Sequence, residues 1–273
     1  MISTPDFTFT VAASCTKCSA CSHVCPSSII AMTADGPTLP NAKICIKCGH
    51  CVAICPVAAL DFSWTPLKNQ TNIEKPLSIT AEEAEQFLRS RRSIRSYRKL
   101  EVPTDKLEKI LDIAHYAPTG GNSQSISYVV IKSSETIKAL SNFTLEWIDA
   151  LAKTNASFRQ YANLSKISKG TGSDMIFRGA PAAIVAVGPR KLPMARDNAR
   201  FNLAYAELFA PTLGLGTCWA GFFEMSTSEY NKEVYDILGL TEEQMVVGAL
   251  MVGYPKYHYK RLVDRNPLKF TLL

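Results

Sequence analysis

Two cysteine-rich runs lie near the N-terminus: CTKCSACSHVCP at residues 15–26 and CIKCGHCVAICP at residues 45–56. The two runs share four Cys, one Lys and a final Pro at a shift of 30 residues. Such self-similarity predicts a small unit that has been duplicated in tandem. Eight of the nine cysteines in the chain belong to these runs, so the first 55 residues hold nearly all of its thiol chemistry.

Both runs have the spacing C-x2-C-x2-C-x3-C-P, which is how bacterial two-cluster proteins bind a pair of 4Fe-4S clusters. In that arrangement the fourth Cys of each run ligates the other cluster. The predicted ligands of the first cluster are Cys15, Cys18, Cys21 and Cys55. Those of the second are Cys45, Cys48, Cys51 and Cys25. Residues 1–62 closely resemble bacterial-type ferredoxins.

Zinc and disulfides are the alternative uses for these cysteines. A zinc ribbon needs two C-x2-C pairs and leaves the third cysteine at that spacing without a role. Disulfides need an oxidising compartment, whereas the stretch MISTPDFTFTVAAS has no basic residue before its short apolar part and predicts no secretory signal. We therefore expect iron–sulfur clusters in a cytoplasmic protein.

Length and composition restrict the class of protein further. With 273 residues the chain is long enough for two domains, and 47% apolar with 20% charged residues is typical of a soluble globular protein. Its longest apolar runs, at residues 180–188 and 245–253, are about half the ~20 residues that a membrane span needs. We expect neither a membrane nor a nucleic acid as partner.

The domain boundary is expected in WTPLKNQTNIEKP, residues 64–76, a polar stretch with a proline near each end. It separates a predicted two-cluster domain at residues 1–66 from a second domain at residues 76–273. The net charge of +6 comes entirely from the part after residue 62, and six basic residues without an acid lie in RSRRSIRSYRK at residues 89–99. Such a concentration predicts a negatively charged ligand there.

The second domain is expected to mix helices and strands. Thr80 followed by Glu83 has the pattern of a capping box, which predicts that a helix begins there. Further helices are expected at residues 105–116, 194–213 and 226–238, and strands at residues 127–133, 181–188 and 244–252. The alternation predicts an α+β fold.

Three kinds of segment in this domain suit a bound cofactor. Arg91, Ser93 and Arg95 alternate, so an extended backbone would point all three toward one side, where guanidinium and hydroxyl groups suit a phosphate. The alternative is a solvated basic turn. APTGGNSQ at residues 117–124 and GLGTCWAG at residues 214–221 are predicted glycine-rich turns that allow close approach of the backbone to a ligand. GYP at residues 253–255 precedes a basic tail.

These segments, in this order, resemble the nitroreductase family of flavin enzymes over about residues 80–273. The resemblance implies FMN as cofactor, a homodimer with FMN at the subunit interface, and a mixed β-sheet flanked by helices. The FMN-binding residues it implies are Arg91, Arg92, Ser93, Arg95, Pro118, Thr119, Gly120, Asn122 and Gln124. Ala220 and Gly221 match the turn whose amides face flavin N5, and Arg265, with Arg261 or Lys260 as alternatives, matches the phosphate-binding residue of the tail. Thr119 replaces the Ser of the family pattern.

The ferredoxin-like and nitroreductase-like parts together predict an iron–sulfur flavoprotein oxidoreductase. A cluster exchanges single electrons, whereas a flavin also transfers two, so their fusion converts between the two modes. Nitroaromatic compounds, quinones or similar small molecules are the implied acceptors, and ferredoxin or NAD(P)H the donors; no catalytic acid or base is required. The alternatives are an NAD(P)H-dependent FMN reductase with an accessory ferredoxin module, and a non-enzymatic electron or flavin carrier.

Two residues near these segments are expected to be structural. Cys218, which lies outside the cysteine runs, is predicted to be a buried thiol. His115 follows an apolar helical pattern and is predicted to pack on its helix.

Overall fold

The computed structural model describes residues 7–73 and 78–273. The chain divides into two compact units, one formed by Met1–Ser78 and Gly121–Ser123 and one formed by Ile79–Gly120 and Gln124–Leu273. Residues 1–6, part of the stretch that predicts no secretory signal, and residues 74–77, part of the predicted linker, lie outside the described residues.

The first unit consists of short elements around the two cysteine runs. Strand β1 (Phe9–Val11) pairs antiparallel with β4 (Leu60–Phe62), and β2 (Ala31–Thr33) pairs with β3 (Gly36–Thr38). The runs contain the helices α1 (Ala20–His23) and α2 (His50–Ala53), and the 3-10 turns η1 (Ala42–Ile44) and η2 (Leu67–Asn69) complete the unit. Ile30, Val52, Leu60 and Phe62 form its small core with Cys21. Because a core this small contributes little to the free energy of folding, a unit of this kind depends on metal clusters for much of its stability.

The predicted tandem duplication is confirmed in the backbone. Left-handed residues recur at the same shift of 30 as the cysteines, in the pairs Lys17 and Lys47, Ser19 and Gly49, and Ser28 and Ala58. This conformation is uncommon for residues with a side chain, and here it curls the chain around the thiols. The amide of Lys47 donates a hydrogen bond to Cys45 Sγ (3.4 Å), and that of Ala59 donates one to Cys55 Sγ (3.2 Å).

A four-stranded sheet in the order β5-β6-β8-β7 forms the centre of the second unit. Its strands are β5 (Ser127–Ile131), β6 (Ala182–Pro189), β7 (Gly216–Trp219) and β8 (Gln244–Gly253). All three pairings are antiparallel. In addition, an isolated parallel bridge joins Ser93 to Thr217 of β7. β6 and β8 lie in the middle and are buried on both faces, which explains their continuous apolar sequences.

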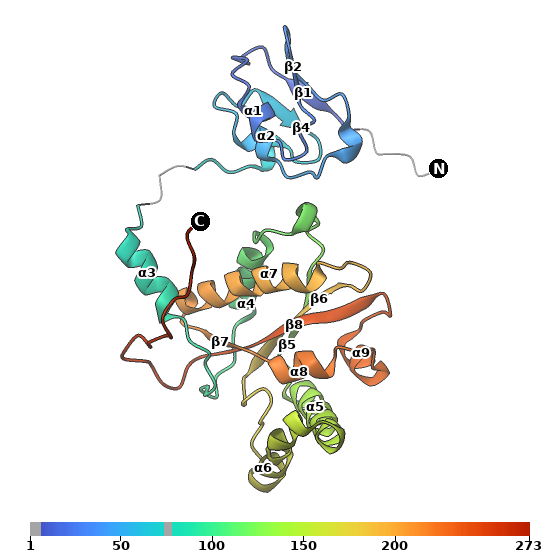
Figure 1. Cartoon of the computed structure of the whole chain (residues 1–273), viewed down its shortest axis with the longest axis vertical. Coiled ribbons are helices and arrows are strands. Elements are labelled where there is room, and N and C mark those ends of the chain that lie inside the picture. The colour runs from blue at the N-terminus through green and yellow to red at the C-terminus, as the bar shows by residue number, and fades with distance from the viewer. Residues whose placement is uncertain (1–6, 74–77) are drawn as a thin grey trace. The chain divides into compact units, whose positions relative to one another are not determined.

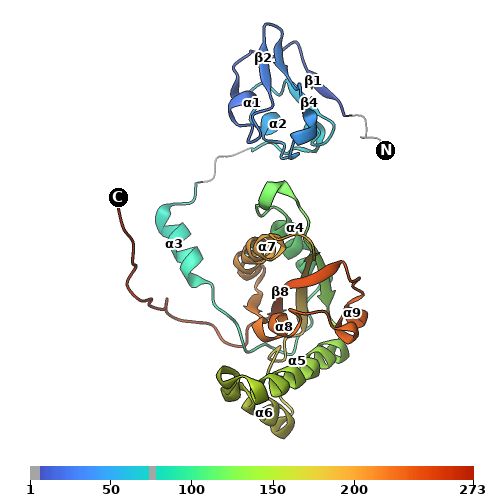
Figure 2. The same cartoon turned by 45° about the vertical axis from the view of Figure 1, so that its right-hand side comes forward.

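Helices cover both faces of this sheet (Figures 1 and 2). On one face α4 (Thr104–His115) and α7 (Ala195–Phe209) pack against Ala182, Ile184 and Ala186. On the other face α5 (Ser134–Thr154), α8 (Gly221–Ser226) and α9 (Lys232–Leu238) pack against Ala183, Val185 and Val187. The period of two in β6 thus supplies one apolar surface to each helical layer.

The remaining elements lie toward the ends and edges of the second unit. They are α3 (Ala81–Ser90), α6 (Asn163–Thr171) and the 3-10 turns η3 (Gly120–Asn122), η4 (Ala156–Tyr161) and η5 (Ala210–Leu213). The capping box that predicts the start of α3 is confirmed: Glu83 N donates to Thr80 Oγ1 (3.1 Å), and Thr80 N donates to Glu83 Oε2 (2.9 Å). The fold class, an α+β protein with a ferredoxin-like and a nitroreductase-like part, is also confirmed.

Several local predictions are wrong. The helix predicted over residues 226–238 begins only at Lys232, as α9. The preceding helix α8 ends at Ser226, where Thr227 Oγ1 donates to Phe223 O and Glu224 O, and Asn231 caps α9. The predicted turn at residues 214–221 contains strand β7, whose pairing with β8 outweighs its glycines. His115 is exposed at the end of α4 rather than packed, whereas Cys218 is buried as predicted.

Residues 134–171 lie outside the predicted elements, although they form α5, η4 and α6. Ser133 caps α5 by accepting a hydrogen bond from Thr136 N (3.2 Å), a signal that the sequence contains. In the described part of the chain no helix is both long and apolar enough to cross a membrane.

Candidate functional site

The eight cysteines of the first unit line two separate cavities. One is lined by Cys15, Cys18, Cys21 and Cys55, the other by Cys25, Cys45, Cys48 and Cys51. Each set combines three thiols of one run with the fourth thiol of the other, which is the grouping that crossed ligation requires. Apolar side chains, including Leu60 at the first cavity and Phe62 at the second, complete the walls.

The donor set of each cavity suits a cluster better than a single ion. Among the described residues, no three His, Cys, Asp or Glu side chains are close enough together to hold one metal ion. Four thiols around an apolar cavity instead suit the corners of a four-iron cluster. Burial raises the pKa of Cys51 to about 11, whereas a hydrogen bond from the Ala20 amide lowers that of Cys18. Because thiolates are the ligands, cluster binding must release protons.

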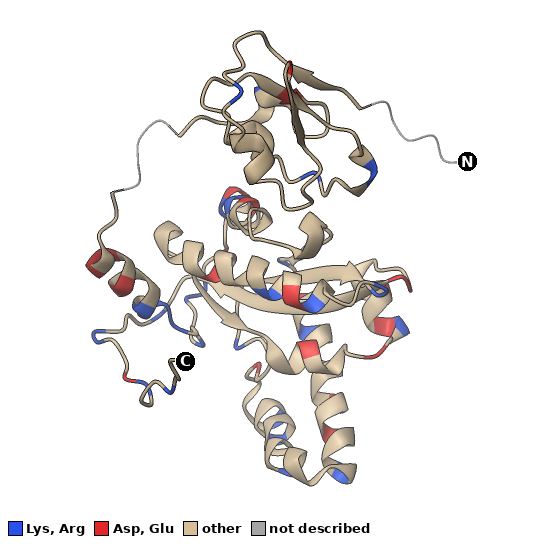
Figure 3. Cartoon of the chain, turned by 45° about the horizontal axis from the view of Figure 1, so that its top comes forward, with Lys and Arg blue, Asp and Glu red and all other residues tan. Residues whose placement is uncertain are grey.

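In the second unit, the basic segment (residues 91–98) runs extended between β7 and the C-terminal tail. Ile94 N donates to Thr217 O (2.8 Å), and Arg98 N donates to Tyr254 O (2.8 Å). Ser93 bridges Thr217, and Tyr97 bridges Pro255. The extended backbone predicted at Arg91, Ser93 and Arg95 is therefore present, and Figure 3 shows Lys and Arg along this segment and along the tail.

The cations of the basic segment are only partly matched by protein groups. Arg92 Nε is buried and has no hydrogen-bond partner in the described part of the chain, which is costly unless a ligand supplies one. The Arg92 guanidinium lies 5.8 Å from the ring centre of Tyr259. Arg95 is exposed, and its recorded hydrogen bond, to Ser93 O, is long (3.4 Å). The segment therefore suits an anionic group such as a phosphate.

Glu207 on α7 is a residue of this region that sequence reasoning missed. Its Oε1 lies 3.7 Å from an Arg91 nitrogen and accepts a hydrogen bond from Thr217 Oγ1 (3.3 Å). Burial raises the pKa of Glu207, and the charge of Arg91 and the Thr217 hydrogen bond oppose the shift. Because the α7 sequence shows Glu207 only as a polar residue among apolar ones, its partner becomes visible only in the fold.

Arg178, just before β6, is the second residue that the sequence analysis missed. It has a left-handed backbone (φ 58°). Burial raises the pKa of the Cys218 thiol, while the charges of Arg95 and Arg178 and a hydrogen bond with Ser93 oppose that shift. Arg178 thus adds a cation beside the basic segment from a distant part of the chain.

The glycine-containing loop at residues 117–124 is held by hydrogen bonds within the loop and to α7. Thr119 Oγ1 accepts a hydrogen bond from Gln124 N (3.1 Å), so the hydroxyl that replaces the family's Ser has a structural role. Gly120 N donates to Asn198 Oδ1 (2.9 Å). Asn122 and Gln124 both have left-handed backbones (φ 52° and 45°), and Pro118 is exposed at the start of the loop.

The structure changes the expectation for the two amides at the end of β7. Ala220 N donates to Ala249 O (2.8 Å), so this amide already has an acceptor inside the protein. Gly221 is the first residue of α8, where amides have no acceptor within the helix. Of the predicted pair, Gly221 is therefore the amide suited to a ligand.

The tail is attached to the basic segment at its beginning. Lys256 N donates to Ser96 O (3.0 Å), and Tyr259 lies against Arg92. Lys260 and Arg261 follow directly, whereas the amide of Arg265 donates a hydrogen bond to Asp264 Oδ1 (2.8 Å). Of the three candidates in the tail, Lys260 and Arg261 are thus adjacent in sequence to the anchored part.

Comparison with known families agrees with this division of the chain. The family model named 4Fe-4S dicluster domain matches residues 9–75, and that of the nitroreductase family matches residues 88–254. The chain belongs to the nitroreductase family. It is an oxidoreductase of that family with a 4Fe-4S dicluster domain ahead of it, as the sequence predicts.

Individual relatives resemble the nitroreductase part. A candidate NADH dehydrogenase/NAD(P)H nitroreductase of Archaeoglobus fulgidus is 26% identical over 64% of this chain and 87% of its own. FMN reductase [NAD(P)H] of Bacillus subtilis is 25% identical over 62% of this chain and 64% of its own. The FMN-bound nitroreductase structure from Bacteroides fragilis covers 70% of this chain and 98% of its own, at 20% identity and a TM-score of 0.57. At that identity the last match shows the fold alone.

Proposed function

We propose that the protein is an iron–sulfur flavoprotein oxidoreductase that carries two 4Fe-4S clusters and FMN. The clusters supply single electrons and FMN supplies two-electron reduction of a nitroaromatic compound, a quinone or a similar small acceptor. The proposed cluster ligands are Cys15, Cys18, Cys21 and Cys55 for one cluster and Cys25, Cys45, Cys48 and Cys51 for the other. The proposed domains are residues 1–66 and 76–273.

One observation carries this proposal: a chain of the nitroreductase family also holds two cavities, each lined by four thiols. Because a cluster exchanges single electrons, such a unit has a clear use beside a flavin, which accepts one or two.

The proposed FMN site uses the cations of the basic segment and of the tail together with the two loops. Arg91, Arg92, Ser93 and Arg95 bind the phosphate and ring, with Lys260, Arg261 or Arg265 of the tail at the phosphate. Pro118, Thr119, Gly120, Asn122 and Gln124 contact the flavin, and the peptide of Ala220 and Gly221 faces N5. The buried Arg92 Nε supports this assignment because it lacks a protein partner among the described residues.

Ferredoxin is the donor that suits the clusters, because both exchange single electrons. NAD(P)H is the alternative donor, because two relatives carry names that include this nucleotide. For assembly we propose a homodimer: in the described chain α3 has no buried residue although it carries Phe87 and Leu88, and the tail exposes Leu268 and Phe270. Apolar surface of this kind suits a second copy of the chain.

Anaerobic stopped-flow absorbance tests the proposed function, because clusters and flavin absorb differently. With a one-electron donor we expect the iron–sulfur signal to bleach before the flavin signal, and a nitroaromatic acceptor to restore both. Reduction of FMN by NAD(P)H with the clusters still oxidised would instead support the accessory module. Reducible centres without turnover of any acceptor would support a carrier.

A further inference from the structure

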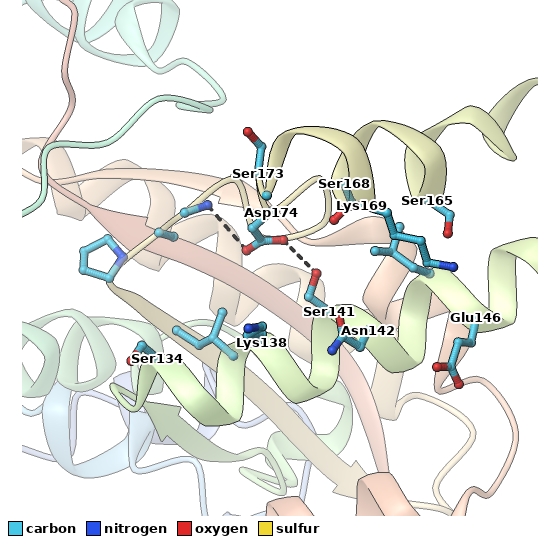
Figure 4. Close-up of a pocket in the computed structure, with 16 residues that line it drawn as sticks. Ser134, Lys138, Ser141, Asn142, Glu146, Ser165, Ser168, Lys169, Ser173 and Asp174 are labelled. Carbon is cyan, nitrogen blue, oxygen red and sulfur yellow. Dashed lines mark hydrogen bonds between the residues drawn. The ribbon is translucent and has the colours of Figure 1, made fainter.

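A pocket of about 660 Å³ between α5, α6 and the loop at residues 173–181 belongs to neither proposed site (Figure 4). Ser141 Oγ donates to Asp174 Oδ1 (2.8 Å), which also accepts from two backbone amides of its own loop (both 2.9 Å). Lys138 of α5 and Lys169 of α6 line the pocket and are exposed. Because Asp174 is occupied in holding the loop and the two lysines lie in solvent, these walls specify no particular ligand.

The two cysteine-lined cavities differ from each other at positions that the duplication relates. The first cavity is the one lined by Cys15, Cys18, Cys21 and Cys55, and the second is the one lined by Cys25, Cys45, Cys48 and Cys51. At the shift of 30 residues, Thr16 corresponds to Ile46 and Met32 to Phe62. Thr16 and Met32 line the first cavity, whereas Ile46 and Phe62 line the second. Corresponding places on the two walls therefore carry chemically different side chains.

The first cavity has a hydroxyl beside one of its thiols. Hydrogen bonds from the Ala20 amide and the Thr16 side chain lower the pKa of Cys18, so the Thr16 hydroxyl donates to the Cys18 sulfur. Ile46, the counterpart of Thr16, has no side-chain donor. Cys18 is also exposed, whereas its counterpart Cys48 is partly buried. The first run thus offers its second thiol both a hydrogen bond and contact with solvent.

The second cavity is closed by aromatic side chains. Phe9 and Phe62 line it, with ring centres 5.8 Å apart, and the ring of Trp64 lies 5.1 Å from that of Phe62. No aromatic residue is among the described residues that line the first cavity. Because an apolar shell restricts solvent access to a metal site, the thiols of the second cavity have the drier surroundings.

Both differences act in the same direction on the reduction potential. A reduced cluster carries one more negative charge, which hydrogen bonds to its sulfurs and solvent exposure stabilise. The amide bonds to sulfur at Cys45 (3.4 Å) and Cys55 (3.2 Å) supply one donor to each cavity. They do not distinguish the cavities, whereas Thr16 and the exposed Cys18 favour reduction at the first.

We propose that Thr16 determines the order in which the two clusters accept electrons, and that the cluster of the first cavity is reduced first. This inference rests on the proposed function, because it requires both clusters. Each cluster takes up one electron, so the first electron from a one-electron donor resides at the first cavity and the second electron at the second cavity.

Redox titration of the full-length, cluster-loaded and FMN-loaded protein with dithionite, followed by electron paramagnetic resonance, tests the proposal. Cys25→Ala, which keeps all four thiols of the first cavity, identifies the signal that belongs to it. In the wild type we expect the ratio of reduced to oxidised cluster to be about tenfold higher at the first cavity, which is a gap of about 59 mV for one electron.

Exchanges between the two runs test the role of the hydroxyl. Thr16→Val should lower the ratio at the first cavity about fivefold, as loss of one hydrogen bond predicts, and leave the second cavity unchanged. Thr16→Ser should restore the wild-type ratio, and Ile46→Thr should raise the ratio at the second cavity. Ser28→Ala is the matched control, because it copies Ala58 of the other run and Ser28 lines neither cavity; it should change both ratios less than about twofold.

His50 is a second polar difference between the cavities, since it lines the second at the place that Ala20 has in the first. His50→Ala should keep the wild-type order. An order that disappears in His50→Ala but persists in Thr16→Val would assign it to His50 and overturn the role of Thr16.

The outcomes separate this proposal from the proposed function. Equal ratios at the two cavities in the wild type, or earlier reduction of the second, would overturn the order. Thr16→Ser that behaves like Thr16→Val, or a Thr16→Val shift of equal size at both cavities, would overturn the role of the hydroxyl. A protein that binds no iron would contradict the proposed function itself.

Discussion

At the scale of single residues, three arginines of the basic segment differ in their surroundings. Arg91 has the partly buried Glu207 nearby, Arg92 has a buried nitrogen without a partner among the described residues, and Arg95 is exposed. The alternation of Arg91, Ser93 and Arg95 is visible in the sequence and predicts that the three side chains lie on one side of an extended segment. Their unequal surroundings depend on β7 and α7, which no local pattern reveals.

Arg95→Ala should weaken FMN binding and leave the clusters intact. Loss of one charge-assisted contact costs roughly 1.5–3 kcal/mol, or about one to two decades of affinity. Fluorescence titration of the FMN-free protein measures the affinity, and iron analysis checks the clusters. Arg89→Ala is the control, because Arg89 pairs with Glu85 on the exposed surface of α3. Equal FMN affinity in both variants would show that the basic segment is a solvated surface.

Glu207→Gln should change stability in a pH-dependent manner. Burial raises the pKa of Glu207, so the folded protein is stabilised by the protonated carboxyl, and this contribution is lost as the pH rises through the folded pKa. Gln resembles the protonated form. The stability of the variant relative to the wild type should therefore increase as the pH rises above about 4.3, the ordinary pKa of Glu, measured as the thermal unfolding midpoint.

Glu101→Gln is a control of opposite sign for this prediction. The hydrogen bond and charge of Lys132 lower the pKa of Glu101, so its contribution is present at neutral pH and is lost as the pH falls through its folded pKa. The relative stability of this variant should therefore decrease with rising pH. A stability difference between Glu207→Gln and the wild type that does not change with pH would contradict a buried carboxyl with a raised pKa.

At the scale of elements, the cysteine runs are the most predictable part of the chain. Their spacing and their shift of 30 predict a duplicated unit, and α1, α2 and the left-handed residues recur at that shift. The helices α5 and α6 show the opposite case. Their sequences contain capping and apolar patterns, but the pocket between them depends on how the Asp174 turn folds back onto Ser141.

Cys25→Ala should affect the cluster held by the second run more than that held by its own run. Cys25 lines the cavity of Cys45, Cys48 and Cys51, so its loss opens one corner of that cluster. We expect iron analysis to fall from about eight irons per chain toward about four. Cys55→Ala is the reciprocal variant, because Cys55 lines the other cavity.

Electron paramagnetic resonance of the reduced variants distinguishes which cluster is lost. The same cluster signal disappearing in Cys25→Ala and in Cys55→Ala would contradict crossed ligation. Zinc in place of iron in the wild-type protein would contradict the clusters themselves.

At the scale of the whole molecule, the cysteine-rich unit precedes the nitroreductase unit in the chain, so it can be removed by an N-terminal truncation. Deletion of residues 1–66 should leave a folded, FMN-binding dimer, because the second unit has its own sheet and cores on both faces. If clusters feed the flavin, this protein should lose reduction by one-electron donors. It should still reduce a nitroaromatic compound after chemical reduction of its FMN.

Size-exclusion chromatography with light scattering and FMN absorbance check the truncated protein before its kinetics are measured. Full activity of the truncated dimer with a one-electron donor would show that the clusters are not on the electron path. A full-length Cys25→Ala, Cys55→Ala variant provides the same test without removing the unit.

The sequence by itself determined that the chain has a dicluster part and a nitroreductase part, and it determined how the eight cysteines group around two cavities. Cysteine spacing defines cluster ligation because a cubane needs closely spaced thiols and one distant thiol, and buried strands such as β6 need continuous apolar runs. Only the tertiary structure decided which polar groups meet across distant segments. Glu207 with Arg91, Arg178 with Cys218, and Lys138 opposite Lys169 are each separated by at least 30 residues. Such pairs depend on strand order and helix packing, and those are set by the burial of the whole core rather than by local sequence.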